Sequence, residues 1–202
     1  MKKVFTILAI SITTLSTAQE SIGSYAMSYF EKENYDIAAT KPKSSGDFSY
    51  YIDVCSRDSS IKNVTLSIES DDIVKFKEAL NKAKMKYDSW SKTAKENNVT
   101  TLDKTIEGVR FYSCVAFLYG TKWQFDFSVS YKFRAKIIEN HMYLIIQNKS
   151  EMVSSSNQFM KSDGFLMVFK SLEEIDAFLH EFDDQKVREY FNKKGAKEDL
   201  FE

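Results

Sequence analysis

The sequence predicts an α+β fold: one domain with a mainly antiparallel sheet of about six strands and two amphipathic helices on one face, in the order ββαββββα. Several short segments alternate apolar and polar residues, as half-buried strands do. Two other segments place apolar residues three and four positions apart, which is typical of amphipathic helices. The 202 residues include only six glycines and one proline, which favours long elements joined by short turns.

The first eighteen residues have the features of a secretory signal peptide. Lys2 and Lys3 precede an apolar run that ends at Leu15, and the small residues Ser16 and Ala18 occupy positions −3 and −1 of a cleavage site before Gln19. The apolar run is shorter than the roughly twenty residues that a membrane-spanning helix needs. We therefore expect residues 1–18 to be removed, and the mature chain to be exported to the periplasm or secreted, without a transmembrane segment.

The charge balance does not favour a polyanionic partner. Removal of Lys2 and Lys3 leaves 26 basic and 29 acidic residues, a net charge of about −3. Nucleic-acid partners call for a basic excess or a basic stripe, so none is predicted. The most basic stretch, residues 75–86, places most of its lysines off the apolar positions of a helix, as on a solvated helix face.

Residues 19–46 show no sustained period and end in the turn-rich stretch KPKSSG. We interpret them as an N-terminal arm with one short helix around Ser24 to Phe30. The domain itself is expected to span residues 47–195. It opens with two strands separated by the turn-forming stretch SRDSS, which predicts a hairpin. Their alternating apolar residues are Phe48, Tyr50, Ile52 and Val54 in the first strand, and Val64, Leu66 and Ile68 in the second.

A long helix is expected to start at Ser70, where the period changes. Its hydroxyl is a suitable N-cap, and Asp71 and Asp72 suit the positive end of the helix dipole. Asn97 and Asn98 are reasonable stop signals. The apolar positions lie three and four apart over about six turns; they are Ile73, Phe76, Leu80, Ala83, Tyr87, Trp90 and Ala94.

Four more strands and a second helix complete the predicted domain. The strand segments are GVRFYSCVAFLYG, KWQFDFSVSYKFR, HMYLIIQNK and GFLMVFK. The second helix starts at Ser171, which has capping-box spacing with Glu174, and it is expected to end at Gly195. Residues 196–202 form a polar C-terminal tail. The apolar face of this helix consists of Ile175, Phe178, Leu179 and Phe182.

An aromatic row in the second of these strands admits two interpretations. It consists of alternate residues, namely Trp123, Phe125, Phe127, Val129, Tyr131 and Phe133. The row could be a core face or an exposed platform for a sugar, a lipid or a base. Both helices need an apolar surface to cover their stripes, and the sheet is the large partner available. We therefore predict that the row belongs to the core.

No recognisable catalytic or metal-binding pattern occurs. His141 and His180 are the two histidines, and neither has the spacing of a zinc motif or of a nucleophile-activating pair. Phosphate-loop, dinucleotide and GxSxG patterns are absent. Asp53 and Asp126 could meet across strands as an acid pair, although solvated carboxylates are the usual case. No catalytic residue, cofactor or metal ligand is predicted.

Cys55 and Cys114 are the two cysteines, and export would expose them to oxidation. A disulfide can form if their strands are neighbours and both side chains share a face. Two buried thiols are the alternative. The residue pattern leaves both open.

These features predict a function class rather than a specific function. Export together with the missing catalytic pattern favours a non-enzymatic binding or interaction module, whose ligand would be a protein or a small molecule. The alternative is an extracytoplasmic hydrolase that uses carboxylates. A pocket with convergent acids would support the hydrolase.

Overall fold

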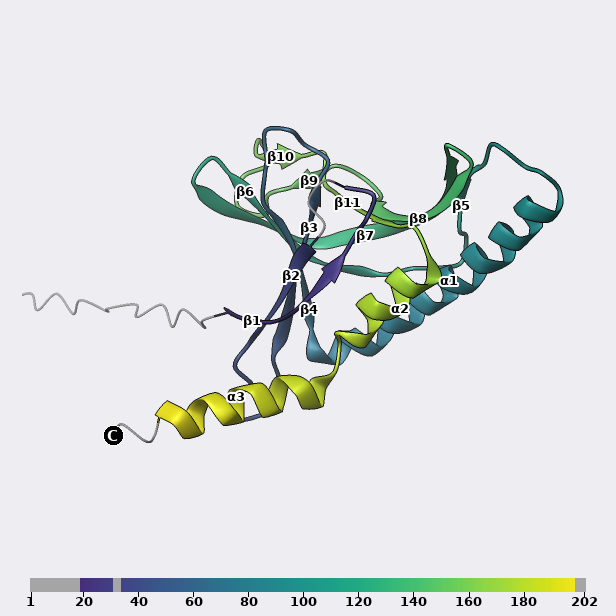
Figure 1. Ribbon diagram of the computed structural model, residues 1–202. Helices are drawn as coiled ribbons and strands as arrows, with labels where there is room; N and C mark the ends of the chain where they lie inside the picture. Colours follow the sequence, from purple (N-terminus) through teal and green to yellow (C-terminus); the bar gives the residue numbers. More distant parts are fainter. Residues whose placement is uncertain (1–18, 31–33, 199–202) are drawn as a thin grey trace, which may run out of the picture.

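Antiparallel strands form one large, curved sheet against which the helices pack (Figure 1). The computed structural model describes residues 19–30 and 34–198. Within these residues the predicted α+β class and single domain are confirmed. The main sheet has nine strands rather than about six, and the described part of the chain forms three α-helices rather than two. The elements are β1 (Gln19–Ala26), β2 (Asn34–Thr40), β3 (Ser49–Ser56), β4 (Val64–Glu69), η1 (Ser70–Asp72), α1 (Ile73–Glu96), β5 (Asp103–Thr105), β6 (Tyr112–Tyr119), β7 (Lys122–Ile138), β8 (His141–Asn148), β9 (Met152–Val153), β10 (Lys161–Ser162), β11 (Phe165–Phe169), α2 (Leu172–His180) and α3 (Asp184–Glu198).

The strand pairing closes on itself. The sheet order is β1-β2-β3-β11-β8-β7-β6-β4, with β5 added beside β7, and β4 also pairs with β3. Strand β3 therefore pairs with β2 along residues 50–52, with β11 at residues 55–56, and with β4 along residues 49–54. Closure leaves few open sheet edges, so most backbone groups of the strands have partners.

Residues 19–46 do not form the predicted arm, because they supply β1 and β2. Strand β2 pairs with β3, so the sheet begins at Gln19 rather than after Gly46. The predicted helix around Ser24 to Phe30 is also wrong, since this stretch ends β1 and then turns. A register shift between Ser21 and Gly23 interrupts the alternation of β1. The sequence of β1 therefore lacks the regular apolar and polar alternation that predicts a strand. The predicted signal peptide lies outside the described residues.

The helices differ from prediction at their ends. Helix α1 follows the expected apolar stripe, but Ser70 does not cap it; its hydroxyl accepts a hydrogen bond from the Phe48 N–H at 3.4 Å. The predicted second helix is two helices, α2 and α3, with a break after His180. Ser171 caps α2 as expected, accepting from the Glu174 N–H at 3.2 Å. Helix α3 continues through Gly195 into the predicted tail.

Aromatic side chains join the helices to the sheet. Helices α1 and α2 lie side by side over one side of the sheet (Figure 1), and their apolar faces share its core. Phe76 of α1 is fully buried and lies within 5.0 to 6.4 Å, between ring centres, of four other rings. Those rings belong to Phe111, Tyr131, Phe178 and Phe182.

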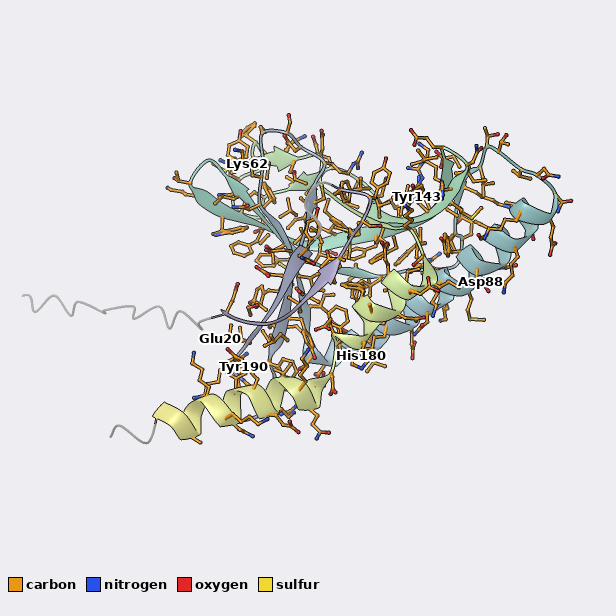
Figure 2. The ribbon with its side chains drawn as sticks, viewed as in Figure 1. Glu20, Lys62, Asp88, Tyr143, His180 and Tyr190 are labelled. Atoms are coloured by element: carbon orange, nitrogen blue, oxygen red, sulfur yellow. The ribbon has the colours of Figure 1, made fainter. Side chains whose placement is uncertain are left out.

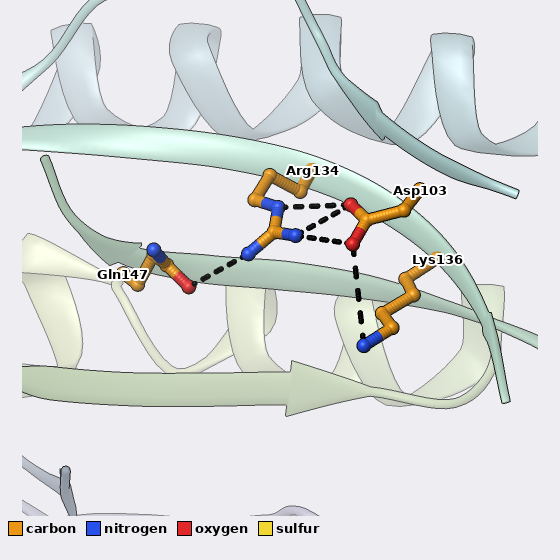
Figure 3. A network of polar contacts seen from close by, with 4 residues as sticks. All are labelled: Asp103, Arg134, Lys136 and Gln147. Atoms are coloured by element: carbon orange, nitrogen blue, oxygen red, sulfur yellow. Dashed lines mark hydrogen bonds and ion pairs between the residues drawn. The ribbon is translucent and has the colours of Figure 1, made fainter.

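Strand β5 is held on β7 by an ion-pair network on the outer side of the sheet (Figure 3). The Arg134 guanidinium donates to both Asp103 carboxylate oxygens, from Nε to Oδ1 at 3.2 Å and from Nη2 to Oδ2 at 2.5 Å. Lys136 lies 4.0 Å from the same carboxylate, and Gln147 of β8 accepts from Arg134 at 3.4 Å. A two-point arginine contact of this kind fixes the position of the loop that follows α1.

Candidate binding surface on β6 and β7

The aromatic row of β7 is split between two faces of the sheet. Val129, Tyr131 and Phe133 are buried, as predicted for a core strand. The other three side chains face solvent, with exposed fractions of 46% for Trp123, 41% for Phe125 and 67% for Phe127. The core interpretation therefore holds for the second half of the row and is wrong for the first half.

A β-bulge explains the split. Val129 pairs with Ser113 and Asp126 pairs with Val115, so β7 advances by three residues while β6 advances by two. Because side chains alternate between faces, one extra residue reverses the alternation. The Ser128 N–H donates to the Asp126 carboxylate at 3.2 Å, which bonds the two residues across the bulge.

The polar residues of the first half of β7 point inward and are tied to the segment around β9. Gln124 is only 6% exposed and accepts from the Ser154 hydroxyl at 2.7 Å. Asp126 accepts from the Val153 N–H at 3.0 Å, and the Ser155 N–H donates to the Phe125 carbonyl at 2.8 Å. Turning the aromatic rings inward would break these buried bonds, so the outward position of the rings is built into the fold.

Trp123, Phe125 and Phe127 form the feature that we call the aromatic surface. The Phe125 and Phe127 rings are nearly parallel, at 8°, with centres 6.2 Å apart. Leu118 pairs with Trp123 and the small Ala116 pairs with Phe125 on the neighbouring strand β6. The three rings therefore form a row next to the shorter side chains of β6. They lie on an open face of the sheet rather than in a cavity.

The two cysteines do not form the disulfide that the sequence left open. Cys55 lies on β3 and Cys114 on β6, and β4 runs between these strands. The pairings of Cys114 with Ser67 and of Ser67 with Tyr51 place both cysteines on the outer face. They are kept apart because β4 lies between their strands and because Cys55 is four residues along β3 from Tyr51. Burial raises the pKa of the Cys114 thiol to about 11, so it stays protonated and is a poor nucleophile near neutral pH.

Asp53 and Asp126 do not form the acid pair considered from the sequence. Strands β4 and β6 separate them, and they lie on opposite faces of the sheet. Asp53 accepts from the Thr65 hydroxyl at 2.9 Å, whereas Asp126 holds the β-bulge and Val153. Both carboxylates therefore have structural partners and no common substrate position.

The histidines also lie apart. His141 is exposed at the β7–β8 turn, where its Nδ1 is 3.0 Å from the Glu139 carbonyl. His180 ends α2 (Figure 2) and lines a pocket of about 440 Å³ with Lys77, Asp183 and Asp184.

The polar neighbours of His180 are engaged in structural bonds. Lys77 donates to the Phe182 carbonyl, and Asp183 accepts from the Gln185 N–H at 2.9 Å at the start of α3. Asp184 accepts from the Tyr50 hydroxyl at 3.0 Å. The pocket therefore brings acids near a histidine without a nucleophile and base in hydrogen-bond contact.

No protein-family model, curated protein or solved structure matches this chain. Among the residues described, no group of three or more metal-ligating side chains could hold a metal ion. No helix in the described part of the chain is long and apolar enough to cross a membrane. Three of the large apolar side chains that the described residues expose, Trp123, Phe125 and Phe127, gather in one row on the aromatic surface.

Proposed function

We propose that this chain is an exported, non-enzymatic interaction module that binds a protein partner through the aromatic surface. The sequence of residues 1–18 supports export. The observation that carries the binding role is the solvent exposure of three large aromatic side chains in a row, maintained by a bulge and by buried polar bonds beneath it. A contiguous exposed apolar patch of this kind often marks an interaction site.

A protein partner suits the shape and chemistry of this surface. Protein interfaces are enriched in Trp, Tyr and Phe, and a few such residues supply most of the binding energy. The surface is an open strand face rather than a concave pocket, which small-molecule sites usually need. Covering the exposed parts of the three rings removes roughly 300 Å² from water, or about 7 kcal/mol before the entropic cost of association.

The positions of the acids and histidines favour this proposal over a hydrolase. Asp53 and Asp126, the carboxylates considered for hydrolysis, are separated by two strands. The acids near His180 accept hydrogen bonds that hold the start of α3 and Tyr50. A hydrolase that uses carboxylates needs two of them about 5 to 10 Å apart around one bond.

Capture from the producer's own envelope fraction tests the proposal. The mature chain, beginning at Gln19, would be immobilised and compared with the Phe125→Ala/Phe127→Ala variant. Met85→Ala is the matched control, since Met85 is 73% exposed on α1, away from the aromatic surface. We expect one protein to be retained by the parent and the control and lost with the double variant.

Direct affinity measurement with the purified captured protein completes this test. The double variant should bind at least about tenfold more weakly, because losing two aromatic contacts costs more than 1.4 kcal/mol. Equal retention by all three chains would contradict the proposal. Turnover of a glycan or peptide pool by the mature chain would favour the hydrolase instead.

A further inference from the structure

A second candidate site lies between α3 and the turn that joins β2 to β3. A pocket of about 320 Å³ opens there, and three cationic side chains line it: Lys41 and Lys43 of the turn, and Arg188 of α3. Ser44 and Asn192 add polar groups, and Pro42 and Phe191 supply apolar wall. The pocket therefore combines positive charge, hydrogen-bond donors and a small apolar surface.

The turn and the arginine are held in place by other contacts. The Lys43 N–H donates to the Asp47 carbonyl and the Gly46 N–H to the Lys43 carbonyl, both at 2.8 Å. The Arg188 guanidinium lies 5.6 Å from the centre of the buried Phe48 ring. Gly46 has φ +93°, and a Cβ added there would lie 3.2 Å from an Arg188 nitrogen. A side chain at Gly46 would therefore disturb the pocket.

The three cations are not neutralised within the described part of the chain. None of them has a carboxylate within 4.0 Å there, whereas α3 pairs its Lys186 with Glu181 at 2.8 Å and its Lys193 with Glu189 at 3.8 Å. Asp47 lies four residues from Lys43 and Asp184 four residues from Arg188, but their carboxylates accept hydrogen bonds from the Ser45 and Tyr50 hydroxyls. In a chain of net charge −1, this concentration of positive charge is local.

We propose that this pocket binds a phosphate- or sulfate-type oxyanion, free or as the ester of a small molecule. The arginine fork can contact two oxygens of such a group, and the two lysines add point charges that do not require fixed geometry. Its volume lies within the usual range for small-ligand sites, so Pro42 and Phe191 can contact a group attached to the anion.

The pocket and the aromatic surface occupy opposite ends of the sheet. The turn leads into Ser49, which pairs with Glu69 at one end of β4, whereas the β6–β7 hairpin that carries Trp123 meets the other end of β4 through Phe117 and Val64. Failure of the proposed protein-binding role would leave the oxyanion site unaffected, and the reverse also holds.

Titration calorimetry at low ionic strength tests the site with inorganic phosphate, sulfate and a hexose phosphate. Arg188→Gln and Lys41→Gln/Lys43→Gln remove charge from the pocket, and the double variant leaves the contact of Arg188 with Phe48 intact. Lys62→Gln is the matched control, because Lys62 is exposed in the β3–β4 loop, far from α3 (Figure 2). Melting curves of all variants check that each chain is folded.

We expect one-to-one binding of a soluble oxyanion. Either pocket variant should weaken this binding about tenfold or more, because each of the two removes a charge-assisted contact. The control should bind as tightly as the parent chain. Tighter binding of the hexose phosphate than of inorganic phosphate would assign the ester as ligand, and equal binding would assign the free ion. Absence of binding by every soluble oxyanion would overturn the proposal. So would equal weakening by Lys62→Gln, or binding to anionic lipid vesicles alone.

Discussion

Replacing Phe76 by alanine tests how the helices are attached to the sheet. The side chain is fully buried on α1, and its ring contacts two rings from the sheet side and two from the region of α2. The substitution therefore removes one side chain that touches both layers of the core. The remaining rings are held by their own contacts, so the space can close only in part.

The expected loss follows from these contacts. Truncation of a buried phenylalanine costs about 3–5 kcal/mol, and aromatic pairs add about 0.5–1.5 kcal/mol each, so Phe76 belongs at the upper end of that range. For a chain of this size, each kcal/mol lowers the melting temperature by about 2–4 °C, so a loss of about 5 kcal/mol corresponds to roughly 10–20 °C.

Urea unfolding followed by far-ultraviolet circular dichroism, together with calorimetry, measures both quantities. Met85→Ala is the control, because Met85 lies on the same helix and is 73% exposed. Its effect should stay within about 0.5 kcal/mol. A loss below about 1 kcal/mol for Phe76→Ala, or equal losses for the two variants, would show that α1 does not anchor the core.

Four further predictions concern α2, the thiols and the N-terminus. Ser171→Ala should lower the unfolding free energy by about 1 kcal/mol in urea titrations, because it removes the N-cap bond to the Glu174 N–H, whereas Ser171→Thr should retain most of it. Thiol titration of the denatured monomer should find two thiols, and none would contradict the strand order. Burial holds the pKa of the Cys114 thiol in the folded protein near 11, above the ordinary 9.0. The contribution of this protonated thiol to the free energy of unfolding is therefore complete below pH 9 and is lost as the pH rises through 11. Mass spectrometry of the exported protein should find Gln19 as its first residue, and an intact Met1 would contradict export.

Local pattern was enough to find most of the regular elements. The six predicted strands correspond to β3, β4, β6, β7, β8 and β11, and the apolar stripe from Ile73 to Ala94 lies within α1. Alternation and 3.6-residue spacing are properties of neighbouring residues, so the sequence carries them directly. The Ser171 cap was predictable for the same reason, since its partner lies three residues away.

Strands β1 and β2 show where local pattern is insufficient. The alternation of β2 is short and that of β1 is broken near Gly23. Their stability comes from partners far along the chain, including the hydrogen bond from the Tyr25 hydroxyl to the Asp53 carbonyl at 2.7 Å. A segment whose contacts are mostly distant has little signature of its own.

The sequence by itself determined the fold class, the long helix, the main strands and a signal-peptide-like start. Only the tertiary structure decided which half of the β7 row is buried, because the bulge depends on how β6 and β7 pair. It also decided that β4 separates Cys55 from Cys114, and that Arg188 meets Lys41 and Lys43 at one pocket. Strand order, register and the joining of distant segments arise from contacts between residues far apart in the chain, and the spacing of residues along a chain does not encode them.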